Sequence, residues 1–467
     1  QADTDTNAST EAKDTTAAAG TEAAETTEAE KEWYGTEDGK TITLHFWGGV
    51  QPEYGYDDLC ANFNEQYKDK GLQVEYVRYV NDDNGNLQLE TYLMGGGDVD
   101  LFIGYGGRTK MDKRVDSNLL LDMSGMLNDI GFNLDDELGV ANMAEYHYDD
   151  GAVYGFPTKY ENSRWILINE DMFKEAGLDI PYDGWTYSEF LADAEKLTHG
   201  EGQDKVYGVC WARKQSGKSI LYALDGVLGA NQIYKNEDGT EVNFDNDVYR
   251  AGLNLVKETL DKGYAIPIED EFSEDISVAN TFLQGKCAIM LGVAQMRLCM
   301  DQENYPHDFT TALVPAPVPD DEKYNTEFYR KQIGTTGAGD LLSISANTKY
   351  PEASFEFAMW YLKGGMSPLV KGGRIPLWNG VNKDEVLSVL KEKAQGSIDM
   401  DSMENYLSLD TTQGVAAIKG HASSEISSAW FEEFDAMCYG KQSVDQTVQN
   451  MEKRGNELIQ TELSSQK

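Results

Sequence analysis

Hydrophobic residues beyond residue 40 recur at two spacings, one typical of strands and the other typical of helices. Residues 41–47 alternate polar and apolar side chains, which predicts a strand that ends at two glycines. Leu, Phe and Tyr then recur at four-residue spacing over 59–67, as one face of a helix does. Residues 72–77 and 100–103 predict two more strands, and the helix between them ends at the three glycines 95–97. Strands alternate with helices, which favours a doubly wound α/β lobe.

A second series of elements begins near residue 154. Thr186 and Glu189 have the spacing of a capping box, which predicts that a helix begins there. The hydrophobic pattern predicts strands over 164–169, 206–209 and 286–291, and helices over 171–176, 251–262, 275–284, 423–438 and 444–461. The chain has 467 residues, which is too long for one compact core, so two lobes are expected.

Residues 1–40 differ in composition from the rest of the chain. They are mainly Ala, Thr, Glu and Asp, with eleven acids against three bases and almost no large apolar residue before Trp33. Such a segment buries too little surface to offset its chain entropy, so we expect a disordered tether. The sequence begins at Gln1 rather than at a methionine, which suggests a processed or trimmed N-terminus. We interpret the segment as a spacer from a lipidated cysteine outside this sequence; a fraying terminus is the alternative.

The charge of the chain excludes some classes of partner. The formal net charge is −42, which repels phosphates, so nucleic-acid binding is not expected. The same charge disfavours anionic membrane surfaces and polyanionic substrates, and fits an extracellular protein that binds neutral or cationic ligands. No run of about 18 apolar residues is present to span a membrane.

Motifs for metal binding or catalysis are weak or missing from the sequence. The five cysteines form no CxxC pair and are interpreted as buried thiols, with a Cys287–Cys299 disulfide left open. Residues 236–241 resemble part of a calcium loop, but a hairpin turn at Asp238-Gly239 explains them better. The sequence has no GxSxG or HExxH motif. We therefore predict neither a cofactor nor a metal site, and no catalytic residue.

Several aromatic and planar polar residues follow predicted strands. Ligands of open α/β sheets bind beyond the carboxyl ends of the strands. This rule selects Trp47, Tyr105, Trp211, Gln295 and Arg297. Aromatic faces and planar hydrogen-bonding groups suit a sugar, which presents apolar C–H faces and hydroxyls that need partners when buried.

The order of several short segments resembles a known family. These segments are Thr41–Trp47 with the following glycines, Gly95–Ile103, Tyr154–Pro157, Ile166–Phe173, Gly184–Thr186, Phe282–Gly292, Ser343–Leu362 and Tyr439–Gln446. Together they resemble the extracellular solute-binding proteins of ABC transporters, in the carbohydrate-binding branch that includes maltose-binding protein. The resemblance covers nearly all of the chain after residue 40.

The resemblance implies an α/β fold, a two-lobed periplasmic-binding-protein-like (type II) clamp with a hinge. The first lobe is expected to span 41–150 plus 338–372, and the second 151–337 plus 373–467. A monomer is expected.

The resemblance also implies ligand contacts. Trp47 and Tyr105 match contact positions after two strands, and Tyr160 and Glu161 match a segment that often carries an aromatic residue and a carboxylate. Gln295 stands where maltose-binding protein carries a stacking Trp, so a hydrogen bond is expected there instead. Two further candidates complete the predicted site: Trp430, one turn from a late aromatic position of the family, and Trp378, in a loop bounded by Gly and Pro.

The predicted function is extracellular capture of a sugar, with an oligosaccharide as the preferred cargo, and its delivery to the permease of an ABC importer. The expected location is the surface of a Gram-positive bacterium, held by a lipid anchor. Two alternatives stay open. The same clamp serves another solute such as a peptide or a polyamine, or the chain is a secreted glycoside hydrolase that uses a carboxylate pair such as Glu161 and Asp340.

Overall fold

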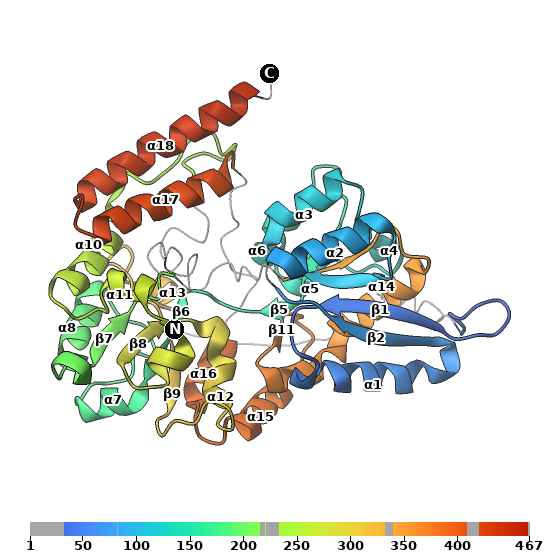
Figure 1. Ribbon diagram of the computed structural model, residues 1–467, viewed down its shortest axis with the longest axis horizontal. Helices are drawn as coiled ribbons and strands as arrows, with labels where there is room; N and C mark the ends of the chain where they lie inside the picture. Colours follow the sequence, from blue (N-terminus) through green and yellow to red (C-terminus); the bar gives the residue numbers. More distant parts are fainter. Residues whose placement is uncertain are drawn as a thin grey trace, which may run out of the picture. The chain divides into compact units, whose positions relative to one another are not determined.

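The computed structural model describes residues 32–81, 83–214, 220, 233–331, 340–408 and 420–465 (Figure 1). A five-stranded sheet holds strands from three distant parts of the sequence in the order β2-β1-β3-β10-β4. The strands are β1 (Ile42–Gly48), β2 (Leu72–Arg78), β3 (Leu101–Gly104), β4 (Phe156–Pro157) and β10 (Leu341–Ile344). β1 runs parallel to β2 and β3, whereas β10 runs antiparallel to β3 and β4.

Helices cover both faces of this sheet (Figure 1). The predicted helix face around residues 59–67 is confirmed, because Leu59 and Phe63 are fully buried in α1. Leu89 and Leu93 of α2 are likewise buried. The helices in these parts of the chain are α1 (Tyr56–Tyr67), α2 (Asp83–Gly95), α3 (Gly107–Asp116), α4 (Ser124–Asp129), α5 (Leu134–Leu138), α6 (Val140–Met143) and α14 (Pro351–Trp360), with short turns η1 (Pro52–Tyr54), η2 (Lys68–Lys70), η3 (Ala144–Tyr146), η7 (Tyr361–Gly365) and η8 (Ser367–Gly372).

A second, four-stranded sheet has the order β7-β8-β6-β9. Its strands are β6 (Trp165–Asn169), β7 (Tyr207–Cys210), β8 (Cys287–Leu291) and β9 (Thr311–Pro315). β7 and β8 are parallel, but β6 is antiparallel to both of its neighbours, so this sheet is mixed. All residues of β6, β8 and β9 are buried, as expected of strands that are covered on both faces.

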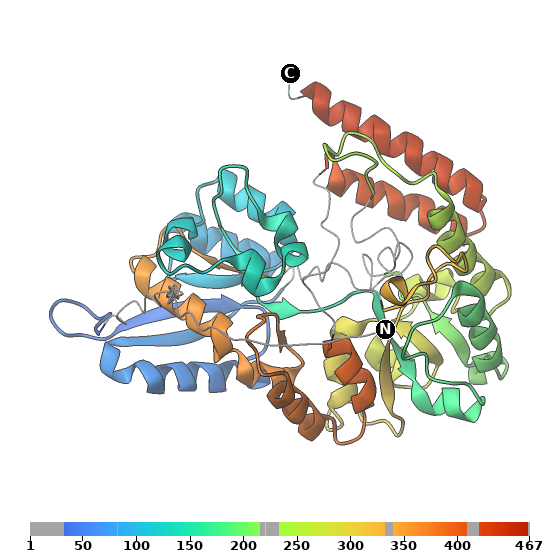
Figure 2. The ribbon, with the colours of Figure 1, turned by 180° about the vertical axis from the view of Figure 1, so that it is seen from behind.

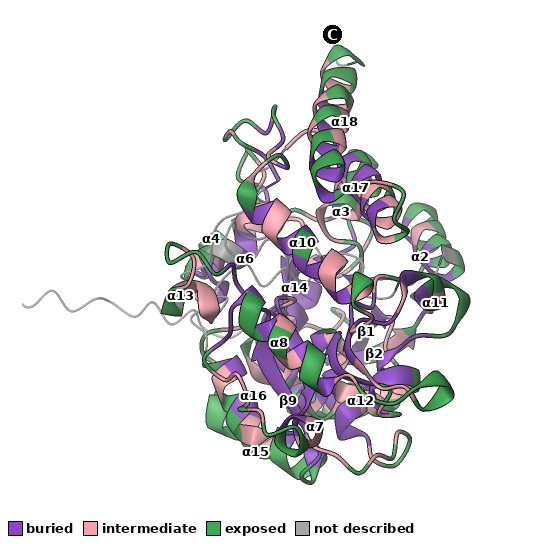
Figure 3. Cartoon of the chain, turned by 90° about the vertical axis from the view of Figure 1, so that its left-hand side faces the viewer, coloured by how far each residue is buried: buried purple, intermediate pink, exposed green. Residues whose placement is uncertain are grey.

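The remaining helices accompany this second sheet and the C-terminal part of the chain. They are α7 (Glu170–Glu175), α8 (Tyr187–Leu197), α10 (Asp247–Asp261), α11 (Ile268–Ser273), α12 (Met296–Met300), α13 (Glu327–Arg330), α15 (Lys383–Ala394), α16 (Met400–Leu407), α17 (Ser423–Cys438) and α18 (Val444–Ser465), with turns η4 (Gly202–Asp204), η5 (Val278–Phe282) and η6 (Val293–Gln295). α17 and α18 lie side by side in both views (Figures 1 and 2). In Figure 3 strand β9 is buried, whereas α18 carries many exposed residues.

Local sequence signals set several of these boundaries. The capping box is confirmed: the Thr186 side chain accepts from the Glu189 backbone N–H, and Glu189 accepts from the backbone N–H of Thr186. The predicted helix over 275–284 is wrong in type and length, since only the π turn η5 forms there. Ser277 accepts from the backbone N–H of Asn280 at the start of this turn, and Gly285 adopts a positive φ just after it, so the segment has no room for a longer helix.

A two-stranded antiparallel ladder joins β5 (Lys159–Tyr160) to β11 (Ile375–Pro376). Two sheets with their own helices, connected by segments that pass back and forth, confirm the expected two-lobed α/β fold. The residue limits given above for each lobe stay predictions.

All five cysteines are free, so the open question of a Cys287–Cys299 disulfide is settled against it. The predicted turn at Asp238-Gly239 forms, with the Gly239 N–H donating to the Asn236 carbonyl and with Tyr234 bridged to Val242. Within the described ranges, no helix has both the length and the apolar character needed to cross a membrane. In the same ranges, His, Cys, Asp and Glu form no group of three that is arranged to hold a metal ion.

Candidate functional site

A pocket of ≈ 340 Å³ lies at the carboxyl edge of the first sheet. We call it the sheet-edge pocket. The loops after the three parallel strands contribute Gly49, Asn81 and Tyr105, and Asp340 precedes the antiparallel strand β10 at the same edge. Residues from outside the first sheet complete the wall, which is formed by Gly49, Val50, Gln51, Tyr54, Tyr56, Asn81, Tyr105, Lys159, Ala294, Arg297, Asp340, Leu369, Gly372, Gly373 and Arg374. Strand ends are where open α/β sheets bind ligands.

Tyr105 and Gly49 form a close pair in the wall of this pocket. The Gly49 backbone N–H donates to the Tyr105 hydroxyl oxygen at 2.9 Å. A Cβ atom at residue 49 would lie 2.8 Å from the ring of Tyr105, which is too close, so the glycine allows the loop to lie against this ring. Burial raises the pKa of the Tyr105 hydroxyl, although Arg374 nearby opposes the shift, so the hydroxyl keeps its proton at neutral pH.

Four charged side chains form an ionic cluster in the wall of the pocket and behind it. Arg374 donates to Asp340 at 2.9 Å, and the Lys159 ammonium lies 3.4 Å from Asp340 and 2.5 Å from Glu161. Burial by itself would raise the pKa of Asp340, but Lys159 and Arg374 outweigh it and hold the pKa below its ordinary value. Burial would lower the pKa of Lys159, but Asp340 and Glu161 raise it above its ordinary value. All of these shifts favour the charged forms.

The second sheet contributes Arg297 to the same pocket. The chain leaves β8, passes through η6 and places Arg297 in α12, with Ala294 lining the pocket beside it. A Cβ on Gly373 would lie 2.8 Å from the Cβ of Arg297, so the stem of the arginine packs against this glycine. The guanidinium carbon lies 5.9 Å from the centre of the Tyr54 ring, within range of a cation–π contact.

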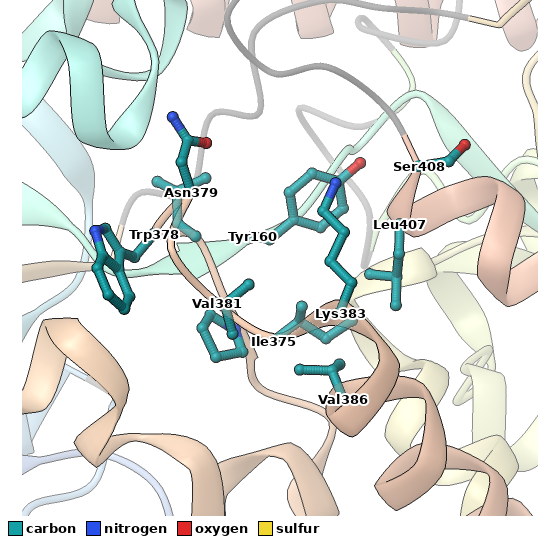
Figure 4. Close-up of a pocket in the computed structure, with 11 residues that line it drawn as sticks. Tyr160, Ile375, Trp378, Asn379, Val381, Lys383, Val386, Leu407 and Ser408 are labelled. Carbon is teal, nitrogen blue, oxygen red and sulfur yellow. The ribbon is translucent and has the colours of Figure 1, made fainter.

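Tyr160 and Trp378 line a different pocket, of ≈ 180 Å³, next to the β5–β11 ladder (Figure 4). Successive residues of a strand point to opposite sides. Tyr160 therefore faces this pocket, whereas its neighbour Lys159 faces the sheet-edge pocket. The Tyr160 hydroxyl donates to the Tyr406 carbonyl at 2.8 Å, and Trp378 donates to Glu137 at 2.7 Å. Figure 4 shows Trp378 at one end of this pocket and Leu407 and Ser408 at the other. Glu161 lines neither pocket and instead pairs with Lys159.

Three tryptophans predicted as ligand contacts are buried instead. Trp47 packs against Tyr92 at 4.9 Å between ring centres and donates to the Asp98 carbonyl, because alternation along β1 turns it into the core. Trp211 donates to Thr259 inside the second lobe. Trp430 stacks on Phe434 one turn further along α17. None of the three lines the sheet-edge pocket.

Of the predicted residues, Tyr105 lines the sheet-edge pocket, and Gln295 is half-buried between the lining residues Ala294 and Arg297. Arg297 itself was selected by the strand-end rule. Lys159, Arg374 and the two tyrosines of the Tyr54-Gly55-Tyr56 segment were missed. The tyrosines follow the first strand closely enough for the strand-end rule to include them. Lys159 and Arg374 come together through the β5–β11 ladder, for which the sequence carries no local signal.

Comparison with protein families gives one match that spans most of the chain. A family model described as bacterial extracellular solute-binding protein matches residues 48–363. The matched range contains the second sheet, most of the sheet-edge pocket and the first sheet apart from β1, of which it includes only Gly48.

Solved structures with the same fold include three sugar-related proteins. A sugar transporter from Rhizobium etli in an open conformation has a TM-score of 0.68 at 18% identity, over 89% of this chain and 99% of its own. A substrate-binding protein from Listeria monocytogenes in complex with cycloalternan has a TM-score of 0.64 at 17% identity, over 90% and 98%. A cyclic alpha-maltosyl-1,6-maltose binding protein from Arthrobacter globiformis has a TM-score of 0.64 at 15% identity, over 90% and 100%. At these identities the likeness shows the fold.

Proposed function

Because this chain belongs to the bacterial extracellular solute-binding proteins, we propose that it captures an oligosaccharide outside the cell and delivers it to the permease of an ABC importer. The related structures from Listeria and Arthrobacter, whose names specify cyclic oligosaccharide ligands, support a sugar as the cargo. The likeness covers about nine-tenths of this chain in both cases.

The observation that carries the proposal is the composition of the sheet-edge pocket. Its wall combines aromatic rings from Tyr54 and Tyr105 with planar or charged hydrogen-bonding groups from Asn81, Asp340 and Arg297. A sugar needs both kinds of group, because its C–H faces pack on rings and each buried hydroxyl needs a partner. Segments of both sheets line the pocket, so domain closure on a ligand is the motion we expect.

The ionic cluster argues for binding without catalysis. The carboxylates Glu161 and Asp340, which are the candidates for a hydrolase, both contact the ammonium of Lys159. A glycoside hydrolase needs one carboxyl group with a raised pKa to donate a proton to the leaving group. The pKa of Asp340 is lowered, so this carboxylate stays ionised and serves to hold Lys159 and Arg374.

The sequence predicts a tether with the limits 1–40, but residues 33–40 belong to the folded unit, where the Tyr34 backbone N–H donates to the Lys70 carbonyl at 2.8 Å, and residues 1–31 lie outside the described residues. We also propose that the acidic segment before residue 33 acts as a leash between a lipid anchor and the folded part, and that the protein works as a monomer on a Gram-positive cell surface. A leash of low-complexity sequence keeps the clamp at high local concentration near a membrane permease.

A thermal-shift screen tests the proposed capture function. The full chain is heated with a panel of oligosaccharides, with peptides and polyamines as controls, and with the Tyr105→Ala variant beside the wild type. Ligand at about 100 times its Kd adds roughly 2.7 kcal/mol to stability, which is easily detected. A shift with a glycan that Tyr105→Ala loses supports sugar capture at this pocket. A shift only with a peptide or a polyamine would overturn the sugar assignment and leave the clamp in place.

A further inference from the structure

The sheet-edge pocket is basic in an otherwise acidic protein. The chain has 81 acids against 39 bases, yet three bases and one acid line this pocket: Lys159, Arg297, Arg374 and Asp340. The overall composition therefore does not describe the charge that a bound ligand meets.

Pairing inside the ionic cluster accounts for all of these charges except one. Arg374 pairs with Asp340 at 2.9 Å, and Lys159 pairs with Glu161 at 2.5 Å, so the four charges of the cluster balance. Among the described residues, no carboxylate lies within 4.0 Å of the Arg297 guanidinium. The contacts that hold Arg297 are the Tyr54 ring at 5.9 Å and Gly373 against its stem. Among the charges that line the pocket or pair with its lining residues, one positive charge, that of Arg297, is left in excess.

An arginine held in this way is prepared to bind an anion. Gly373 lies against the Cβ of Arg297, and the Tyr54 ring centre lies 5.9 Å from the guanidinium carbon, so the side chain has a neighbour at its base and one at its charged end. The planar guanidinium presents parallel N–H donors that match the two oxygens of a carboxylate, and hydrogen bonds of this charged type are about twice as strong as neutral ones. A neutral sugar would enclose this cation in the pocket without a counter-charge.

We propose that the sheet-edge pocket binds an acidic oligosaccharide, one that carries the carboxylate of a uronic acid, and that Arg297 binds this carboxylate. The inference rests on the proposed function and specifies its substrate class. One excess charge matches one carboxylate, whereas a phosphate dianion would add repulsion from Asp340 in the same wall. The proposal reverses the expectation of a neutral or cationic ligand that the net charge suggested.

The net charge and the local charge act at different distances. Salt screens exposed charges beyond about 8–10 Å, so the −42 of the chain slows the approach of an anion more than it weakens the bound state. Contacts inside the pocket are screened less and set the affinity and the specificity.

Matched pairs of ligands test the proposal by isothermal titration calorimetry on the full chain. Each pair consists of an oligouronide and the same oligomer with its carboxyl groups reduced to primary alcohols, which keeps linkage and length. We expect the acidic member to bind at least tenfold more tightly. In Arg297→Gln this preference falls to about threefold or less, mainly through weaker binding of the acid. Arg297→Lys, which keeps the charge but not the planar fork, retains an intermediate preference.

Arg454→Gln on α18 is the matched control, because it removes the same charge from ion pairs with Glu432 and Glu433 that lie outside the pocket. It should keep the full preference for the acid. If the wild type binds the neutral members as tightly as the acids, the inference is wrong while sugar capture stands. If no member of any pair binds, the sugar assignment fails with it. If circular dichroism shows that Arg297→Gln does not fold, Arg297→Met replaces it, because methionine keeps an aliphatic chain against Gly373. If neither variant folds, the affinity of the wild type for the acidic member relative to the neutral member of each pair tests the proposal.

Discussion

Arg374 donates a hydrogen bond from Nη1 to the Oδ2 of Asp340 at 2.9 Å, and this pair links the residue before β11 to the residue before β10. Both side chains are largely enclosed, with 9% and 17% of their surface exposed. Taking two charges out of water is unfavourable unless each charge finds its partner. The pair therefore fixes how the first sheet meets the β5–β11 ladder at the wall of the sheet-edge pocket.

Asp340→Asn should destabilise the protein strongly, since it leaves Arg374 buried without its carboxylate and removes one of the two partners of Lys159. We expect a loss of about 3–5 kcal/mol in the free energy of unfolding, measured by urea denaturation. Glu258→Gln is the control, because its partner Lys262 is half exposed and such surface pairs contribute about 0.5 kcal/mol. Equal losses in the two variants would contradict the structural role of the pair.

The pH dependence of stability follows from the direction of the Asp340 shift. The pKa of this carboxyl is lower in the folded protein than its ordinary value of 3.8, so the folded state binds the proton less well than the unfolded state. Its contribution is complete above about pH 4 and is lost as the pH falls further. Asp340→Asn should therefore lie closer to the wild type in stability at pH 3 than at pH 7. A constant difference at both pH values would contradict the shift.

Glu271 should give the opposite pH dependence. It is fully buried, and burial raises its pKa to about 7. Hydrogen bonds from the Arg213 backbone N–H and the Cys210 thiol, together with the charge of Arg213, lower the pKa but do not outweigh burial. The folded state holds the proton more tightly than the unfolded state, so stability falls as the pH rises from about 4.5 to 7. The loss amounts to about 3 kcal/mol. Glu271→Gln should reduce this slope in denaturation curves recorded across the range, and an unchanged slope would assign it to other groups.

Trp47→Ala should lower stability and leave the pocket wall in place. The indole is 4% exposed, packs against Tyr92 and donates to the Asp98 carbonyl, so its removal creates a cavity and leaves an acceptor without its donor. We expect a loss of about 3–5 kcal/mol by chemical denaturation. At a temperature where the variant is still folded, ligand affinity should stay within about threefold of the wild type. A large loss of affinity in a stable protein would return Trp47 to the binding site.

Two tyrosines allow a direct comparison of the two pockets. Tyr105→Phe removes a hydroxyl from the wall of the sheet-edge pocket, and we expect it to weaken sugar binding by about tenfold, the equivalent of one hydrogen bond between this hydroxyl and the ligand. Tyr160→Phe removes the donor to the Tyr406 carbonyl, and it should cost about 1 kcal/mol of stability while leaving affinity within twofold. Calorimetric titration and denaturation of both variants check this. The reverse pattern would place the ligand in the pocket beside Trp378.

Local patterns in the sequence determined the elements that depend on neighbours in the chain. Periodicity was sufficient for the buried face of α1, for β1 and for the long C-terminal helices, because a helix or a strand buries residues at a fixed spacing. The capping box at Thr186 was also readable, since both of its hydrogen bonds join residues three apart. The strand-end rule reached Tyr105 after β3 and Arg297 after β8, because ligands of open α/β sheets bind beyond the carboxyl ends of the strands.

Only the tertiary structure decided which of these side chains meet in one pocket. Trp47 and Tyr105 both lie near a strand end, yet one packs in the core and the other lines the pocket, because a shift of one residue along a strand reverses the direction of a side chain. Lys159 and Arg374 are far apart in sequence, and no local pattern indicates that β5 and β11 pair. The net charge of the chain likewise gave no indication of a basic pocket, since composition adds up charges while the fold selects the few that a ligand contacts.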